Sequence, residues 1–173
     1  MEGFKTVAVV KMPKVNLDKT WSKSSAKLFQ RNLTSLRQKG VDKCASALQQ
    51  GLYDSLESNT WSWPRDTLRV NGSMAGTTRT IYDTGGLYSS QKLATSHQVT
   101  QSKLTVTYSA PYASLVHYGG YIQPYGNKNA NTVLIPARPW VDAVLNGTHG
   151  QDKIDLGKIL LDTITTGLGD FVI

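Results

Sequence analysis

Residues 24–56 read SSAKLFQRNLTSLRQKGVDKCASALQQGLYDSL, and the architecture follows from this segment. Small or apolar residues recur every three or four positions, which places their side chains on one face of an α-helix. The pattern predicts a helix from about Ser24 to Ser55, with Ser24 or Ser25 as its N-cap and a bend or break at Gly40. The positions of the predicted buried stripe are Phe29, Leu33, Leu36, Gly40, Cys44, Leu48, Leu52 and Leu56.

Positive charge is concentrated at the start of the chain. Residues 1–43 contain ten Lys or Arg and three Asp or Glu, whereas residues 44–173 contain nine of each, so the net charge of +7 lies in the first quarter. Two interpretations stay open: these cations face nucleic acid or an acidic partner, or they lie on a solvated helix face. The polar face of the predicted helix carries Lys27, Arg31, Arg37, Lys43 and Gln50.

The rest of the chain predicts short strands and two short helices. Residues 4–10 indicate a strand or extended segment within an N-terminal arm of residues 1–20, and alternation indicates half-buried strands at 90–95 and 103–108. A hairpin loop is expected at 96–102 and a further strand at 132–135. One helix should start near Pro139 and stop near Asn146–Gly147. A last helix is expected over 154–166, and its apolar positions are Ile154, Leu156, Ile159, Leu160, Leu161 and Ile164.

Two segments lack periodicity and are predicted to be extended loops, residues 58–80 and residues 121–131. The first contains Trp61 and Trp63, which should be buried against the domain or against a neighbouring subunit. The length of 173 residues fits a single domain over residues 1–173.

Motifs for catalysis or metal binding are missing from the sequence. It contains no phosphate-binding loop, no dinucleotide fingerprint and no H-E-x-x-H pair, and Cys44 is the only cysteine and is expected to be a buried thiol. We expect no enzymatic activity, cofactor or metal. No apolar run approaches the length of a membrane span, and the start does not resemble a signal peptide, so a cytosol-like compartment is expected until assembly.

The sequence also contains the residue types of one catalytic alternative. Asp83 and His117, with Ser89 or Ser114, have the residue types of a hydrolytic triad. The structural alternative is that Asp83 organises the turn around Gly85–Gly86 and His117 fills a polar niche. Arg138 is then expected to tie the last strand to the helix that follows, by pairing with Asp83.

Three segments carry a family resemblance. Residues 83–90 (DTGGLYSS), residues 110–119 (APYASLVHYG) and residues 135–140 (IPARPW) resemble, in the same order and after a long helix, elements of tailed-phage tail-component proteins of the HK97 gene-product-10-like and virion-morphogenesis type. The resemblance covers about residues 24–146. The residues that match its structural motif are Asp83, Thr84, Gly85, Leu87, Tyr112, His117, Gly119, Pro136, Arg138, Pro139 and Trp140.

The resemblance implies an α+β fold, in which a small, mainly antiparallel sheet is packed by a long N-terminal helix and shorter C-terminal helices. It also implies a structural virion protein of the neck. Such a protein forms a ring, a hexamer or else a dodecamer, that completes the tail and joins it to the head connector, and DNA passes through the lumen without sequence-specific binding.

The expected partners are connector or portal-side proteins and tail tube or sheath proteins, with assembly in the host bacterial cytoplasm. Alternative roles are a minor tail component, a head-completion protein or, outside this family, a nucleic-acid-binding module using residues 1–43. The candidate contacts between subunits or rings are Trp61, Trp63, Tyr121, Tyr125 and Lys128.

Overall fold

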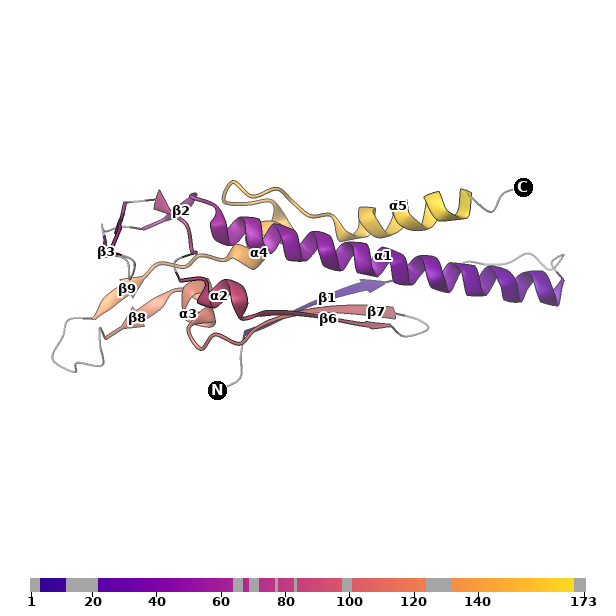
Figure 1. Ribbon diagram of the computed structural model, residues 1–173, viewed down its shortest axis with the longest axis horizontal. Coiled ribbons are helices and arrows are strands. Elements are labelled where there is room, and N and C mark those ends of the chain that lie inside the picture. Colours follow the sequence, from indigo (N-terminus) through magenta and orange to yellow (C-terminus); the bar gives the residue numbers. More distant parts are fainter. Residues whose placement is uncertain are drawn as a thin grey trace. The chain divides into compact units, whose positions relative to one another are not determined.

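The computed structural model describes residues 4–11, 22–63, 67–68, 72–76, 78–82, 84–97, 101–123 and 132–169, and it confirms the α+β class. Figure 1 labels most of its elements along the chain. In chain order they are β1 (Phe4–Lys11), α1 (Lys23–Glu57), β2 (Trp61–Ser62), β3 (Thr67–Leu68), β4 (Met74–Ala75), β5 (Thr78–Arg79), α2 (Gly86–Ser89), β6 (Gln91–His97), β7 (Gln101–Tyr108), α3 (Ala113–Tyr118), β8 (Gly120–Ile122), β9 (Val133–Ile135), α4 (Trp140–Asn146) and α5 (Leu156–Gly169).

The strands form one three-stranded sheet and three short ladders. The sheet has the order β1-β7-β6, so the consecutive strands β6 and β7 are neighbours in it. The ladders β2–β5, β3–β4 and β8–β9 are antiparallel. The prediction of a loop over 58–80 is therefore wrong where β2 to β5 form. Two-residue strands are too short to show a period of two, which is why the pattern missed them.

Contacts between Cα atoms divide the chain into two compact units, which are described separately below. Unit 1 comprises Met1–Thr6, Gln49–Lys92 and Val106–Ile154. Unit 2 comprises Val7–Leu48, Leu93–Thr105 and Asp155–Ile173. Helix α1 and strands β1, β6 and β7 contribute residues to both units.

Helix α1 matches the predicted helix closely. Ser22 caps it, because the Ser25 backbone N–H donates to the Ser22 hydroxyl oxygen at 3.1 Å, so the prediction of Ser24 or Ser25 as the cap is wrong by two or three positions. The helix continues through Gly40 without the predicted break. Of the predicted stripe, Leu36 to Leu56 are buried, and Phe29 and Leu33 are half-buried.

One hydrophobic cluster of unit 2 lies between α1 and α5. Its buried residues are Leu36, Val41, Cys44, Leu160 and Ile164. Two glycines allow the helices to approach: a Cβ on Gly40 would lie 2.5 Å from Leu160 Cδ1, and a Cβ on Gly167 would lie 2.1 Å from Leu36 Cδ2. Helix α5 spans Leu156–Gly169 rather than the predicted 154–166, so Ile154 precedes the helix, and Leu161 is 55% exposed rather than buried.

Cys44 is buried in this core as predicted, and its thiol donates to the Leu156 carbonyl oxygen at 3.2 Å. Burial raises the pKa of the Cys44 thiol, which keeps it protonated and unreactive.

The core of unit 1 is built around large aromatic residues. Trp140 is fully buried and makes edge contacts with Tyr108 at 5.3 Å and His117 at 4.8 Å between ring centroids. The Trp61 indole N–H donates to the Ser55 carbonyl oxygen at 2.7 Å. Trp61 and Trp63 are 2% and 6% exposed, so the first of the two predicted alternatives, burial against the chain itself, is the one observed.

The remaining predicted elements are present with shifted ends. The strands predicted at 90–95, 103–108 and 132–135 correspond to β6, β7 and β9. Strands β6 and β7 are longer than predicted and extend into the predicted hairpin loop. Pro139 is the N-cap of α4, and Gly147 ends that helix in the left-handed conformation with φ 68, as expected. Within the described ranges, no helix is both long and apolar enough to cross a membrane.

Candidate functional site

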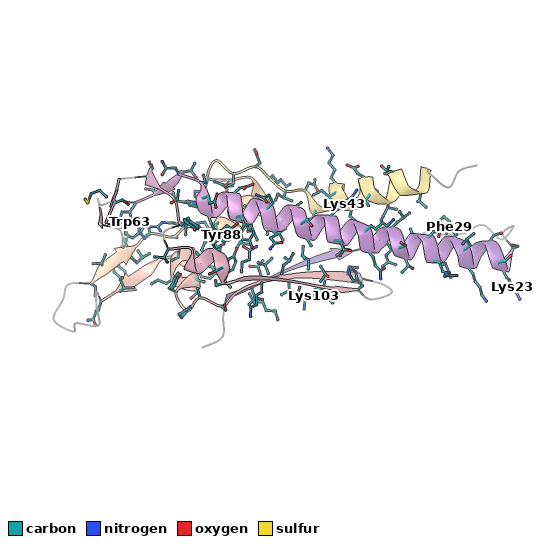
Figure 2. The ribbon with its side chains drawn as sticks, viewed as in Figure 1. Lys23, Phe29, Lys43, Trp63, Tyr88 and Lys103 are labelled. Atoms are coloured by element: carbon teal, nitrogen blue, oxygen red, sulfur yellow. The ribbon has the colours of Figure 1, made fainter. Side chains whose placement is uncertain are left out.

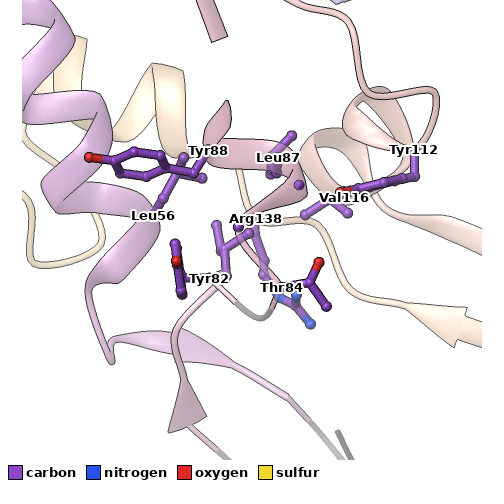
Figure 3. A pocket seen from close by; sticks show the side chains of 11 residues that line it. Leu56, Tyr82, Thr84, Leu87, Tyr88, Tyr112, Val116 and Arg138 are labelled. Atoms are coloured by element: carbon purple, nitrogen blue, oxygen red, sulfur yellow. The ribbon is translucent and has the colours of Figure 1, made fainter. Parts of the chain in front are cut away.

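The three motif segments gather in unit 1 around one pocket of about 290 Å³. Figure 3 shows its lining side chains, with Tyr82 and Tyr88 at one end and Tyr112 at the other. Each motif contributes to the wall: Gly85 and Leu87 come from the first, Tyr112 and Val116 from the second, and Arg138 from the third. The full lining is Leu56, Ile81, Tyr82, Thr84, Gly85, Gly86, Leu87, Tyr88, Tyr112, Val116 and Arg138.

The first and second motifs meet at a glycine. Gly85 adopts φ 78 just before α2, a conformation that glycine accepts without strain. A Cβ on the next residue, Gly86, would lie 2.7 Å from the Tyr112 hydroxyl oxygen. The prediction that this glycine pair permits a positive-φ turn is confirmed at Gly85, and Gly86 makes room for the Tyr112 hydroxyl.

The second and third motifs are joined by backbone contacts. The Arg138 N–H donates to the Val116 carbonyl oxygen at 3.0 Å. Gly119, with φ 73 and ψ 178, ends α3 so close to the third motif that a Cβ would lie 2.7 Å from the Ala137 nitrogen and 2.8 Å from the Ile135 oxygen. The three segments thus pack into one cluster despite their separation in the sequence.

Arg138 is the buried charge of the site. Its side chain is 4% exposed, and its guanidinium carbon lies 4.2 Å from the centre of the Trp63 ring. A cation over an indole face is attracted by the negative face of the ring, and burial strengthens this attraction. Arg138 therefore ties the third motif to the segment after α1. The predicted partner Asp83 lies outside the described residues.

A tyrosine cluster forms the other end of the pocket. The Tyr88 ring stacks on Tyr53 of α1 with centroids 4.0 Å apart, and Tyr82 meets Tyr88 edge-on at 5.8 Å. The Tyr53 hydroxyl accepts a hydrogen bond from the Gln49 side chain at 3.1 Å. Aromatic pairs in these geometries contribute about 0.5–1.5 kcal/mol each beyond their buried area, so the cluster fastens α2 to α1 within unit 1.

His117 fills a polar niche, as the structural alternative predicted. It is 1% exposed, its Nε2 lies 3.3 Å from Asp142 Oδ2, and its ring meets Tyr118 edge-on at 4.7 Å. Burial lowers the pKa of His117 below its usual 6.5, and the Asp142 carboxylate partly opposes this shift. The imidazole is therefore neutral at pH 7, with the Nε2 proton directed to Asp142.

This geometry does not resemble a hydrolytic site. A general base must be within reach of a substrate proton, and the His117 ring is enclosed between Trp140, Tyr118 and Asp142. The Ser89 hydroxyl donates to the Gly86 carbonyl oxygen at 3.3 Å, and Ser114 is exposed on α3. In the described part of the chain, no group of three His, Cys, Asp or Glu residues is placed to hold a metal ion. The pocket offers aromatic and apolar packing surface instead.

The motif residues named from the sequence divide into buried and exposed groups. Leu87, His117, Arg138 and Trp140 are buried, whereas Thr84 and Tyr112 are exposed at the pocket, Tyr112 by 43%. Pro136 and Pro139 are half-buried on either side of Arg138.

The candidate contact residues differ in their exposure to solvent. Tyr121 is 72% exposed on β8, so its ring is available to a partner. Trp61 and Trp63 are covered by the chain's own residues, so they offer no side-chain surface to another subunit, and the prediction that they contact one is not kept. Tyr125 and Lys128 lie outside the described residues.

Sequence reasoning missed Asp142 and the stacked Tyr53–Tyr88 pair. Asp142 lies in the first turn of α4, where an acidic residue is explained by the helix dipole alone. Tyr53 lies within α1 and Tyr88 within α2, and no local pattern connects them. Comparison with known proteins adds no assignment, because no family model, curated protein or solved structure matches this chain significantly.

Proposed function

We propose that this chain is a structural subunit of the neck of a tailed bacteriophage, which forms a ring that completes the tail and joins it to the head connector. The observation that carries the proposal is the gathering of the three motif segments around one pocket of unit 1. Chance matches to short motifs have no reason to meet in space, whereas the elements of a shared fold do. The α+β architecture with its long helix is also what the resemblance implies.

The β8–β9 ladder supplies the surface that we assign to contact with the neighbouring subunit. Tyr121 and Leu134 are register partners in this ladder, so their side chains lie on the same face. They are 72% and 49% exposed, and Tyr118, two residues before β8, is 66% exposed. Tyrosine is enriched in the cores of protein interfaces, and a ring of identical subunits needs such a surface on each copy.

The proposal is tested by sedimentation velocity of the purified chain and of a Tyr121→Ser, Leu134→Ser double variant. We expect the wild type to sediment as a ring, alone or with tail-tube or connector protein added, and the double variant to stay a monomer under the same conditions, because two exposed anchors of the interface are lost. The matched control is Leu28→Ser with Leu161→Ser, which removes two exposed apolar side chains of unit 2, 59% and 55% exposed, and should leave the ring intact.

Two results would count against the assignment. Rings formed equally well by the β8–β9 double variant would exclude this ladder as the subunit contact. Loss of the ring in the control variant would show that assembly responds to general surface apolarity rather than to this face. Binding of the intact ring to tail-tube protein rather than to connector protein would distinguish tail completion from the alternative head-completion role.

A further inference from the structure

Helix α1 carries a cationic surface on its N-terminal part, within unit 2. Lys23, Lys27 and Arg31 follow one another at four-residue intervals, so they lie on one face of the helix, and all three are exposed. Figure 2 shows Lys23 at the first turn, extending away from the ribbon. Polar side chains complete the surface and, with Lys27 and Arg31, line an open hollow; they are Gln30, Thr34, Ser35 and Gln38.

The stability of the fold does not explain these cations. The ion pair between described residues is His117–Asp142, in unit 1. Within the described part of the chain, no carboxylate oxygen lies within 4.0 Å of a nitrogen of Lys23, Lys27 or Arg31. Like charges four residues apart repel each other, and cations in the first turn oppose the helix dipole. Each effect costs a few tenths of a kcal/mol, so the arrangement weakens the isolated helix slightly.

Charge is also segregated along α1. Residues 23–43 contain six Lys or Arg and one acidic residue, Asp42, whereas residues 44–57 contain no Lys or Arg and two acidic residues, Asp54 and Glu57. A helix that needed only solubility would mix the two signs. Segregation instead concentrates positive potential at one place on the molecule, and this attracts a polyanion.

We propose that this cationic surface binds the phosphate backbone of double-stranded DNA without sequence preference. Lys23 and Arg31 are eight residues apart, about 12 Å along the helix, and duplex DNA carries one charge per roughly 1.7 Å, so the three cations can each neutralise a different phosphate. The side-chain amides of Gln30 and Gln38 make no hydrogen bond to other described residues and can donate to phosphate oxygens. The inference goes beyond the proposed neck function, because it requires no ring.

The test is the affinity of the purified full chain for a short labelled duplex of mixed sequence, measured by fluorescence anisotropy between about 50 and 200 mM salt. The variant is Lys23→Gln, Lys27→Gln, Arg31→Gln. The matched control is Lys103→Gln, Lys153→Gln, Lys158→Gln, which removes the same charge from exposed positions elsewhere. Glutamine preserves helix propensity, and far-UV circular dichroism checks that all three proteins are folded alike.

We expect the wild type to bind with a steep salt dependence. The α1 variant should lose about tenfold or more in affinity, and the slope of log K against log salt should fall by roughly 3, near 0.9 for each phosphate contact removed. The affinity of the control for the duplex should stay within about threefold of that of the wild type. A change of this size corresponds to the loss of general electrostatic attraction alone.

Three results would overturn the proposal: no binding by the wild type at the lowest salt, equal losses in the α1 variant and the control, or equally tight binding of poly-glutamate. The last result would assign the surface to an acidic protein partner instead. Sedimentation of the same samples reports the ring separately, so failure of DNA binding and failure of the neck proposal are distinguished.

Discussion

At Gly119 the backbone shows why one motif residue has to be glycine. Its φ of 73 and ψ of 178 lie in a region that is essentially restricted to glycine. The atoms that a side chain would meet are backbone atoms, Ala137 N and Ile135 O, which cannot rotate away as a side chain can. The close approach of α3 to the third motif therefore depends on the missing Cβ.

We predict that Gly119→Ala lowers the free energy of unfolding by about 2–4 kcal/mol, from backbone strain and the forced separation of the two motifs. Urea denaturation followed by tryptophan fluorescence measures it. Gly76→Ala is the control, because Gly76 has no positive φ and its added Cβ would meet nothing within 4 Å. A Gly119→Ala protein as stable as the control would show that the two segments do not pack as described.

His117 makes stability depend on pH. Its pKa is lowered in the folded chain, so between that value and the unfolded value near 6.5 the unfolded chain binds more protons than the folded chain. The contribution of neutral His117 is therefore fully present above about pH 7 and is lost as the pH falls below about 6.5.

We expect the unfolding free energy of the wild type to fall between about pH 7 and pH 5, by at most about 1.4 kcal/mol per pH unit from this group. His117→Gln should flatten that part of the profile. A wild-type profile that rises on acidification through this range would mean that the Asp142 carboxylate outweighs burial at His117.

At the scale of elements, α1 and α5 of unit 2 fit each other through two glycine positions, Gly40 against Leu160 and Gly167 against Leu36. In a helix interior, alanine is favoured over glycine by about 0.5–1 kcal/mol, so the close packing at the buried Gly40 opposes the preference of the isolated helix. The same close approach explains why Gly40 lies inside a continuous helix.

We predict that Gly40→Ala destabilises the protein by about 1–2 kcal/mol, opposite in sign to helix propensity, because the buried Leu160 side chain must shift. Gly169→Ala, at the open end of α5, should stay within about 0.5 kcal/mol of the wild type. Thermal unfolding compares the three proteins. Stabilisation by Gly40→Ala would mean that α5 does not pack against this part of α1.

The sequence predicts an element only where its apolar residues repeat at a regular spacing often enough to be recognised. Helix α1 repeats its apolar spacing over many turns, so both its presence and its buried face follow from the sequence. The ladders of residues 61–79 have two residues per strand and no repeat to detect. The misplaced N-cap has a local cause, since Ser22, Ser24 and Ser25 offer the same chemistry and only the backbone distinguishes them.

The segments that form the candidate site could be predicted from the sequence, but the contacts between their side chains could not. The motif segments could be named from the sequence, and the structural role of His117 could be anticipated. The contacts that hold the site together join residues far apart in the chain, such as Arg138 with Trp63 and His117 with Asp142. Such pairs follow from tertiary packing, for which a single sequence contains no local signal.

At the scale of the whole molecule, two exposed surfaces differ in their chemistry. Unit 1 exposes tyrosine and leucine on the β8–β9 ladder, which suits contact with another protein surface, and unit 2 exposes cations on α1, which suit a polyanion. A neck subunit that encloses a DNA channel needs both kinds of surface. The surface on the β8–β9 ladder depends on the claim that the chain forms a ring, whereas the cationic surface requires no ring.

The most direct test of that claim is the native mass of the purified chain, alone and mixed with tail-tube or connector protein. We predict a closed species of near six copies of the 19.0 kDa chain, alone or once the partner is added. A chain that stays strictly monomeric in all of these samples would contradict it.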